Sequence, residues 1–205
     1  MLHSQTLAPQ TLGLIQSLQE EPLLRGFHLV GGTALALQIG HRMSIDIDLF
    51  TRDDYEVDDA LALFINKYNF QRSYQRGKTV KGFIDGVMID LNRHDYEELQ
   101  VIEEDRVRML SAGDIAAMKL NAITGNGTRV KDYVDVFFLL ELFRLEEMLD
   151  FYKTKYRQDD ALMILRSLVF FDDVDLAEWP RLIREPLLTF DRVKERIGDA
   201  VKPLL

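Results

Sequence analysis

The 205-residue chain contains no cysteine, which excludes disulfide bonds and thiolate metal sites. It has only five prolines. No apolar run approaches the ~20 residues that a membrane-spanning helix needs. The first residues, Met1–Thr6, lack the basic and apolar blocks of a secretion signal. We therefore expect a cytoplasmic protein that does not associate with a membrane.

Basic residues are outnumbered by acidic ones. The chain has 25 Lys and Arg against 34 Asp and Glu, which gives a formal net charge of −9. This balance argues against a general nucleic-acid-binding surface, although it leaves room for a local basic groove. One basic cluster combines Arg72, Arg76, Lys78 and Lys81, and a solvated hairpin is its simpler interpretation. The 47% hydrophobic content is typical of a globular protein.

A glycine turn is the first distinctive feature. The apolar run 27–30 predicts a short buried strand, and Gly31–Gly32 breaks it where backbone can approach another group closely. Thr33 is predicted to cap a helix over 34–39, with Gly40 at its C-terminal end. Bare backbone N–H groups at a helix start are suited to phosphate oxygens.

Two aspartates follow in an alternating segment. A strand would point Asp46 and Asp48 to one face, and Ile45, Ile47 and Leu49 to the other. The two carboxylates would then lie about 6–7 Å apart, which allows them to hold divalent cations between them. As pure structure the pair is unfavourable, because like charges repel and Asp is depleted in strands.

The rest of the chain changes from strands to helices near residue 110. Alternation and turn signals predict strands over 70–76, 79–84 and 87–92, with Asp85-Gly86 as a hairpin turn. Apolar spacing predicts helices over 9–20, 57–68, 111–123, 130–143, 145–156, 160–171 and 180–197, the last interrupted by Pro186. We predict an α/β core over 1–110, and a helical region over 111–205 that completes the active-site cleft.

Asp90, in the interior of the strand predicted over 87–92, adds a carboxylate to Asp46 and Asp48. Oxygen ligands from neighbouring strands suit Mg²⁺, which takes its remaining ligands from water and substrate phosphates. Two such ions can clamp the attacking and leaving oxygens of an in-line phosphoryl or nucleotidyl transfer. The alternative is that Asp90 closes a strand and that Asp46 and Asp48 are simply solvent-facing, and the glycine turn favours the metal site over it.

A second charged group lies in the helix predicted over 130–143. Lys131 and Asp135 are spaced as an i,i+4 pair, which on a surface would contribute only a few tenths of a kcal/mol. Asp135 also lies beside the apolar stripe, so we expect it to point inward and orient Lys131 toward a triphosphate. Lys119 is either a second phosphate-binding cation or ordinary helix surface. The histidines show no metal-ligand spacing, and neither G-x-S-x-G nor a P-loop occurs.

Together these residues resemble a known superfamily. Gly31-Gly32-Thr33, Asp46-Ile-Asp48 and a later strand aspartate are similar to the nucleotidyltransferases typified by DNA polymerase β. More closely, Val30-Gly-Gly-Thr-Ala-Leu with His41-Arg-Met-Ser-Ile-Asp-Ile-Asp-Leu-Phe resembles the AbiEii/AbiGii toxin family of bacterial nucleotidyltransferases. Lys119 and the segment 129–135 match that family's later helical motif. The resemblance covers roughly residues 27–142.

The resemblance implies an α+β fold with a mixed sheet flanked by helices and an NTP-binding cleft. It implies Mg²⁺ on Asp46, Asp48 and Asp90, with Lys131 joining these three as the catalytic residues. It places the nucleotide against Gly31, Gly32, Thr33, Ser44, Lys119, Arg129, Asp132 and Asp135. The glycine pair stands where many relatives have Gly-Ser, and Thr33 could partly replace that hydroxyl.

Our first hypothesis is a Mg²⁺-dependent nucleotidyltransferase that transfers NMP from an NTP to an RNA such as tRNA. The family's role as a toxin in toxin–antitoxin or phage-defence systems implies a cognate antitoxin. A second hypothesis is transfer to a small-molecule or protein hydroxyl, which the acidic balance favours. A third is a non-catalytic interaction protein that retains the fold.

Overall fold

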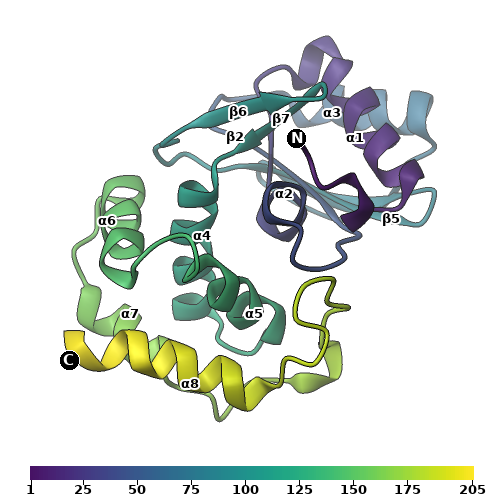
Figure 1. The fold of residues 1–205 in the computed structure, drawn as a ribbon. Helices are drawn as coiled ribbons and strands as arrows, with labels where there is room; N and C mark the ends of the chain where they lie inside the picture. Colours follow the sequence, from purple (N-terminus) through teal and green to yellow (C-terminus); the bar gives the residue numbers. More distant parts are fainter.

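A seven-stranded mixed sheet forms the centre of the computed structural model, which describes residues 1–205 (Figure 1). Its spatial order is β3-β4-β5-β2-β1-β7-β6. The β2–β5 and β1–β7 pairs are parallel and the others antiparallel. The strands are β1 (His28–Val30), β2 (Ile47–Thr51), β3 (Gln71–Arg76), β4 (Thr79–Ile84), β5 (Val87–Arg93), β6 (Val101–Glu104) and β7 (Val107–Leu110). This arrangement confirms the expected mixed-sheet α+β fold.

The chain forms eight α-helices, and none combines the length and apolar character of a transmembrane span. They are α1 (Pro9–Glu20), α2 (Gly31–Ile39), α3 (Val57–Tyr68), α4 (Ala112–Gly125), α5 (Val130–Leu139), α6 (Leu145–Tyr156), α7 (Ala161–Leu168) and α8 (Phe190–Val201). Figure 1 shows α4 to α8 grouped on one side of the sheet. Helix α2 packs against β1 and also against α4 and α5. It therefore joins the sheet to the helical group.

Helix α3 covers one face of the sheet at its β3–β4 end. Val80 and Ile84 of β4 are buried on that face. Gly82, between them, leaves room for the ring of Phe70, which would collide with a Cβ at this position. Phe70 in turn packs on Phe64 of α3, with ring centroids 5.3 Å apart. The opposite face of the sheet carries Asp48 and Asp90.

Local signals gave several element bounds correctly. Helices α1, α3 and α6 begin and end at the predicted residues. Ser111 caps α4, because its Oγ accepts the backbone N–H of Asp114 at 3.2 Å. The Asp85-Gly86 turn has φ angles of 48° and 80°, as a primed hairpin turn requires. These features depend on neighbours in sequence, so the pattern sufficed.

Three predicted helices after residue 129 differ from the structure. The helix predicted over 130–143 ends at Leu139, and the one predicted over 160–171 ends at Leu168. The last helix begins at Phe190 rather than near residue 180, and Thr189 caps it. Residues 180–189 contain two prolines and form a loop. The hairpin of β6 and β7 was not predicted.

Candidate active site

The glycine turn lies against an aspartate of the next strand. Val30 at the end of β1 is paired with Asp48 of β2. Gly31 follows with φ +67°, a left-handed conformation that L side chains rarely adopt, and a Cβ there would collide with the Asp48 carboxylate. Only glycine permits this close approach between the start of α2 and the carboxylate.

Thr33 is not the N-cap that was predicted. Helix α2 already begins at Gly31, so Thr33 lies inside its first turn. Its buried hydroxyl donates to the carbonyl oxygen of Asp46 and lies 2.8 Å from Ser44 Oγ. Thr33 therefore fixes the segment that leads into β2, and the Ser44 hydroxyl is held at the same place.

The two aspartates of the Asp-Ile-Asp segment lie in different backbone contexts. Strand β2 begins at Ile47, so Asp46 precedes it. Ile45 is 66% exposed and does not share the core face with Ile47, contrary to the predicted alternation. Asp48 lies within the strand, half-buried, and is paired with Asp90 of the parallel strand β5. The sheet thus brings two of the three predicted metal ligands side by side.

Asp90 forms an ion pair on the same face. Its Oδ2 accepts a hydrogen bond from Lys81 Nζ at 2.5 Å. No three His, Cys, Asp or Glu side chains of the chain converge closely enough to hold one metal ion. Asp46, Asp48 and Asp90 are therefore neighbours around the turn rather than a closed ligand cage.

The charges around Asp48 nevertheless fit a divalent cation. Burial, together with the negative charge of Asp90, raises the pKa of Asp48 to about 6. Asp90 Oδ1 is buried and has no hydrogen-bond partner. Carboxylate oxygens of this kind are the ligands that Mg²⁺ prefers, and a bound cation would offset the repulsion between the two groups.

A buried ionic network lies behind the turn, centred on Asp135 of α5. The Asp135 carboxylate accepts hydrogen bonds from Arg42 at 2.7 and 3.0 Å, and its Oδ1 lies 2.8 Å from His41 Nε2. Lys119 Nζ of α4 lies 2.6 Å from its other oxygen. Burial alone would raise the pKa of Asp135, but Arg42 and Lys119 hold it well below its usual range.

Lys131 does not contact Asp135, contrary to the predicted orientation. Its Nζ lies 3.1 Å from Glu178, and the side chain is 30% exposed. Lys119, for which two interpretations were open, is buried and also pairs with Asp132 at 2.6 Å. It is not ordinary helix surface. Asp132 and Asp135 therefore both hold Lys119, and Lys131 remains accessible to a ligand.

A cleft of about 250 Å³ opens beside the turn, and residues from distant parts of the chain line it. It is lined by eight of the predicted site residues, Gly32, Thr33, Ser44, Asp46, Asp48, Lys119, Arg129 and Lys131. Gly31, Asp90, Asp132 and Asp135 are not part of its lining. Of these four, Gly31 and Asp90 contact or pair with Asp48, and the other two hold Lys119.

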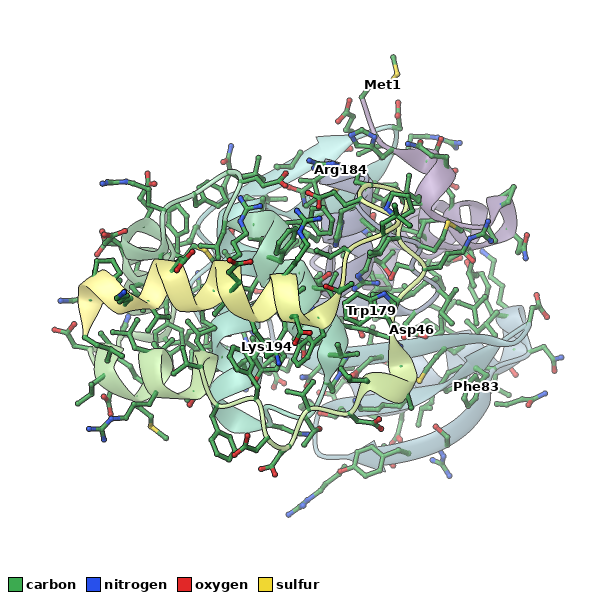
Figure 2. All side chains as sticks on the ribbon, turned by 60° about the horizontal axis from the view of Figure 1, so that its bottom comes forward. Met1, Asp46, Phe83, Trp179, Arg184 and Lys194 are labelled. Atoms are coloured by element: carbon green, nitrogen blue, oxygen red, sulfur yellow. The ribbon has the colours of Figure 1, made fainter.

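Sequence reasoning missed two contributors to the cleft. Arg42 lines it from the segment between α2 and β2, and Trp179–Arg181 closes it from the loop before α8. This loop is fixed by backbone hydrogen bonds, from Met43 N to Arg181 O and from Ile183 N to His41 O. Figure 2 shows Trp179 beside Asp46. Trp179 is the chain's single tryptophan, but no spacing links it to the motifs.

Solved structures share this fold. A candidate nucleotidyltransferase from H. pylori superposes with a TM-score of 0.55 at 18% identity, covering 96% of this chain and 95% of that one. JHP933 from Helicobacter pylori superposes with a TM-score of 0.54 at 18% identity, covering 97% and 93% of the two chains. These similarities concern the fold alone.

The glycine turn that opens α2, the paired strand aspartates and the cleft with its basic side chains are together compatible with nucleotidyl transfer. The sequence profile of the family described as "Nucleotidyl transferase AbiEii toxin, Type IV TA system" matches residues 14–101 and 82–196. The chain belongs to this family, which confirms the resemblance. An uncharacterised protein of Aquifex aeolicus (strain VF5), aq_aa25, is 36% identical over 154 residues, covering 72% of this chain and 74% of that protein.

Proposed function

We propose that this nucleotidyltransferase is Mg²⁺-dependent, uses an NTP and transfers NMP to a hydroxyl of an RNA such as tRNA. The observation that carries the proposal is the pairing of Asp48 with Asp90 beside the Gly31 turn. It unites carboxylates for a cation with backbone N–H groups for phosphate oxygens. In this proposal residues 1–110 supply the metal ligands, and residues 111–205 complete the cleft.

The nucleotide would bind with its phosphates at the start of α2. Gly31, Gly32 and Thr33 would present backbone N–H groups, with the Ser44 hydroxyl beside them. Two cations of the cleft, Arg129 and Lys131, are free enough to move toward a triphosphate. The Arg129 side chain is 58% exposed, and Lys131 pairs only with an exposed glutamate.

Asp132 and Asp135 would contribute by positioning cations rather than by contacting the nucleotide. Asp132 and Asp135 hold Lys119 at the wall of the cleft, where its charge favours the anionic substrate. Asp135 also holds Arg42, which lines the same wall. The four charges cancel, but only the two cations, Lys119 and Arg42, line the cleft, and their ion pairs fix them in place, so they need little reorganisation when the nucleotide binds.

The reaction breaks one phosphoanhydride bond and forms one phosphodiester bond. The acceptor hydroxyl oxygen attacks the α-phosphorus, the bond from that phosphorus to the bridging oxygen of the β-phosphate breaks, and pyrophosphate leaves. The hydroxyl proton passes to a carboxylate oxygen of Asp46, Asp48 or Asp90, the three residues that would hold Mg²⁺. Bound Mg²⁺ supplies charge neutralisation on the phosphate oxygens.

The family description supports a toxin role, from which we infer a cognate antitoxin and a site of action in the cytoplasm, where NTPs and RNA are available. The net charge of −9 is the one observation that favours a small-molecule or protein acceptor instead. The nature of the acceptor is therefore what the first experiment must decide.

The experiment incubates the protein with each labelled NTP, MgCl₂ and total RNA in a cell extract, and separates RNA, protein and small molecules. We expect label in RNA, and none with Asp46→Ala/Asp48→Ala or with EDTA. Asp191→Ala, at an exposed position on α8, is the matched control and should retain full activity. Label in protein or in a small molecule, instead of RNA, would show that the acceptor is not RNA. Absence of all labelling, with no Mg²⁺-dependent NTP binding by calorimetry, would support a non-catalytic protein.

A further inference from the structure

An open stretch of sheet extends from the candidate active site to the β3 edge. The register aligns Asp48 of β2 with Asp90 of β5, Asp90 with Lys81 of β4, and Lys81 with Tyr74 of β3. Directly paired residues share a face, so this row lies on the side of the sheet opposite to α3. Three interstrand spacings of about 4.8 Å give a row roughly 14 Å long.

Aromatic side chains are exposed on this face. Tyr74 is 46% exposed and Phe83 is 39% exposed. Phe83 of β4 is paired with Met88 of β5, next to the Lys81–Asp90 pair, so it lies on the same face. Figure 2 shows Phe83 on the outer strands, beyond Asp46. Two exposed rings that flank a path to catalytic carboxylates are suited to bind a partner with flat apolar faces.

The charge of this edge is also unbalanced. Lys78 is neutralised by Asp54 at 2.9 Å, and Lys81 by Asp90 at 2.5 Å. Arg76 takes part in no ion pair of the structure, and it is paired with Thr79 on the same face as Tyr74. The edge therefore carries an available guanidinium beside the exposed rings, although the whole chain is acidic.

A protein strand added to the edge fits these features less well. The β3–β4 pairing is shifted by a bulge between Arg72 and Tyr74, and all six residues of β3 are exposed. Bulges and long charged side chains are devices that prevent edge pairing. Two exposed rings beside one unpaired guanidinium instead match single-stranded nucleic acid, whose bases stack and whose phosphates attract cations.

We propose that the β3–β4 face binds the single-stranded end of the RNA acceptor. Bases stack on Tyr74 and Phe83, Arg76 contacts a phosphate, and the terminal hydroxyl reaches the carboxylates at Asp90. The row of roughly 14 Å matches about four stacked nucleotides at ~3.4 Å each. This inference rests on the proposed RNA acceptor.

The test uses the full chain and a fluorescein-labelled 12-nucleotide single-stranded RNA of mixed sequence, followed by fluorescence anisotropy. Tyr74→Ala/Phe83→Ala should weaken binding at least tenfold. Arg76→Ala should lower the slope of log K against log[salt] by about 0.7, the value for one phosphate contact on a single strand. Matched controls on α7 and in the turn that follows it, Arg166→Ala and Phe170→Ala, should leave affinity and slope unchanged.

Steady-state labelling then separates the two proposals. For an RNA that the wild type modifies, the double variant should raise the KM for RNA at least tenfold and leave the KM for NTP within twofold. If the wild type labels RNA and the variants match it in KM, affinity and salt slope, the β3–β4 face is not the acceptor site. If the wild type binds NTP but labels no RNA, the proposed function itself is wrong. Equal melting temperatures of variants and wild type exclude a folding defect.

Discussion

The substitution Asp135→Asn removes the central charge of the buried network and keeps the shape of the side chain. Asp135 is fully buried and is the one carboxylate that pairs with Arg42, through two hydrogen bonds. Hydrogen bonds to charged groups contribute roughly 1.5–3 kcal/mol each. Lys119 keeps Asp132 as a partner, so its loss is smaller. We expect the free energy of unfolding to fall by about 3–5 kcal/mol, the usual result of leaving a buried charge unpaired.

Urea denaturation at pH 7, followed by circular dichroism, measures this change. Asp191→Asn is the control, because its ion pair with Lys194 is exposed and should contribute less than about 0.5 kcal/mol. Arg42→Met combined with Asp135→Asn should be less destabilising than the sum of the single changes, with a coupling of about 2 kcal/mol. A loss below 1 kcal/mol for Asp135→Asn, or strict additivity, would refute the network as described.

The contribution of the same network to the free energy of unfolding should depend on pH. The pKa of Asp135 is lowered in the folded state, so its contribution is present above the unfolded pKa near 4 and lost as the pH falls below it. The difference in unfolding free energy between wild type and Asp135→Asn should therefore shrink below pH 4. A difference that grows on acidification would contradict the assignment.

Three further predictions concern single residues. Burial lowers the pKa of His94 to about 4, so on acidification the unfolded state binds a proton before the folded state does, and the free energy of unfolding falls as the pH drops from 7 toward 4. Linkage gives a loss of roughly 1–2 kcal/mol at pH 5. His94→Phe should abolish this loss in urea titrations. Gly31→Ala should cost about 1–3 kcal/mol and reduce NMP transfer, because φ is +67° and the new Cβ collides with Asp48. Lys131→Met should raise the KM for NTP at least fivefold while the free energy of unfolding stays within about 0.5 kcal/mol, since its partner Glu178 is exposed.

The controls for these variants come from the same chain. For Gly31→Ala the control is Gly13→Ala, in α1 with no atom near the new Cβ, which should stabilise by about 0.5–1 kcal/mol. For Lys131→Met it is Lys194→Met, whose KM for NTP should not change. A Gly31→Ala protein as stable and active as wild type, an unchanged KM in Lys131→Met, or an acid-induced loss that persists in His94→Phe would each contradict the corresponding argument.

Sequence patterns predicted elements best where local interactions decide them. The bounds of α3 follow from its apolar spacing, and the start of α4 from the Ser111 cap. The hairpin of β6 and β7 was missed because its turn, Asp105-Arg106, lacks glycine although both residues have positive φ. When non-glycine residues adopt positive φ in a turn, the surrounding sheet stabilises that turn. Its sequence then carries no clear turn pattern.

The loop before α8 shows where sequence patterns fail, because contacts with a distant segment decide its structure. Its apolar residues fit helical spacing, but the structure uses 181–183 to bind the backbone of His41 and Met43. These contacts join segments about 140 positions apart, beyond the reach of any periodicity. They also bring Trp179 to the cleft, which explains why sequence reasoning omitted it.

By itself the sequence determined the residue types of the site, the glycine turn and the alternation that points Asp48 and Asp90 away from the apolar side of their own strands. These depend on the two-residue period of strands and on the backbone freedom of glycine. Only the tertiary structure decided that Asp135 pairs with Arg42, His41 and Lys119, and that Lys131 stays at the cleft. Which charged groups form a buried ion pair depends on which of them are desolvated together. That is set by packing between distant segments rather than by spacing along the chain.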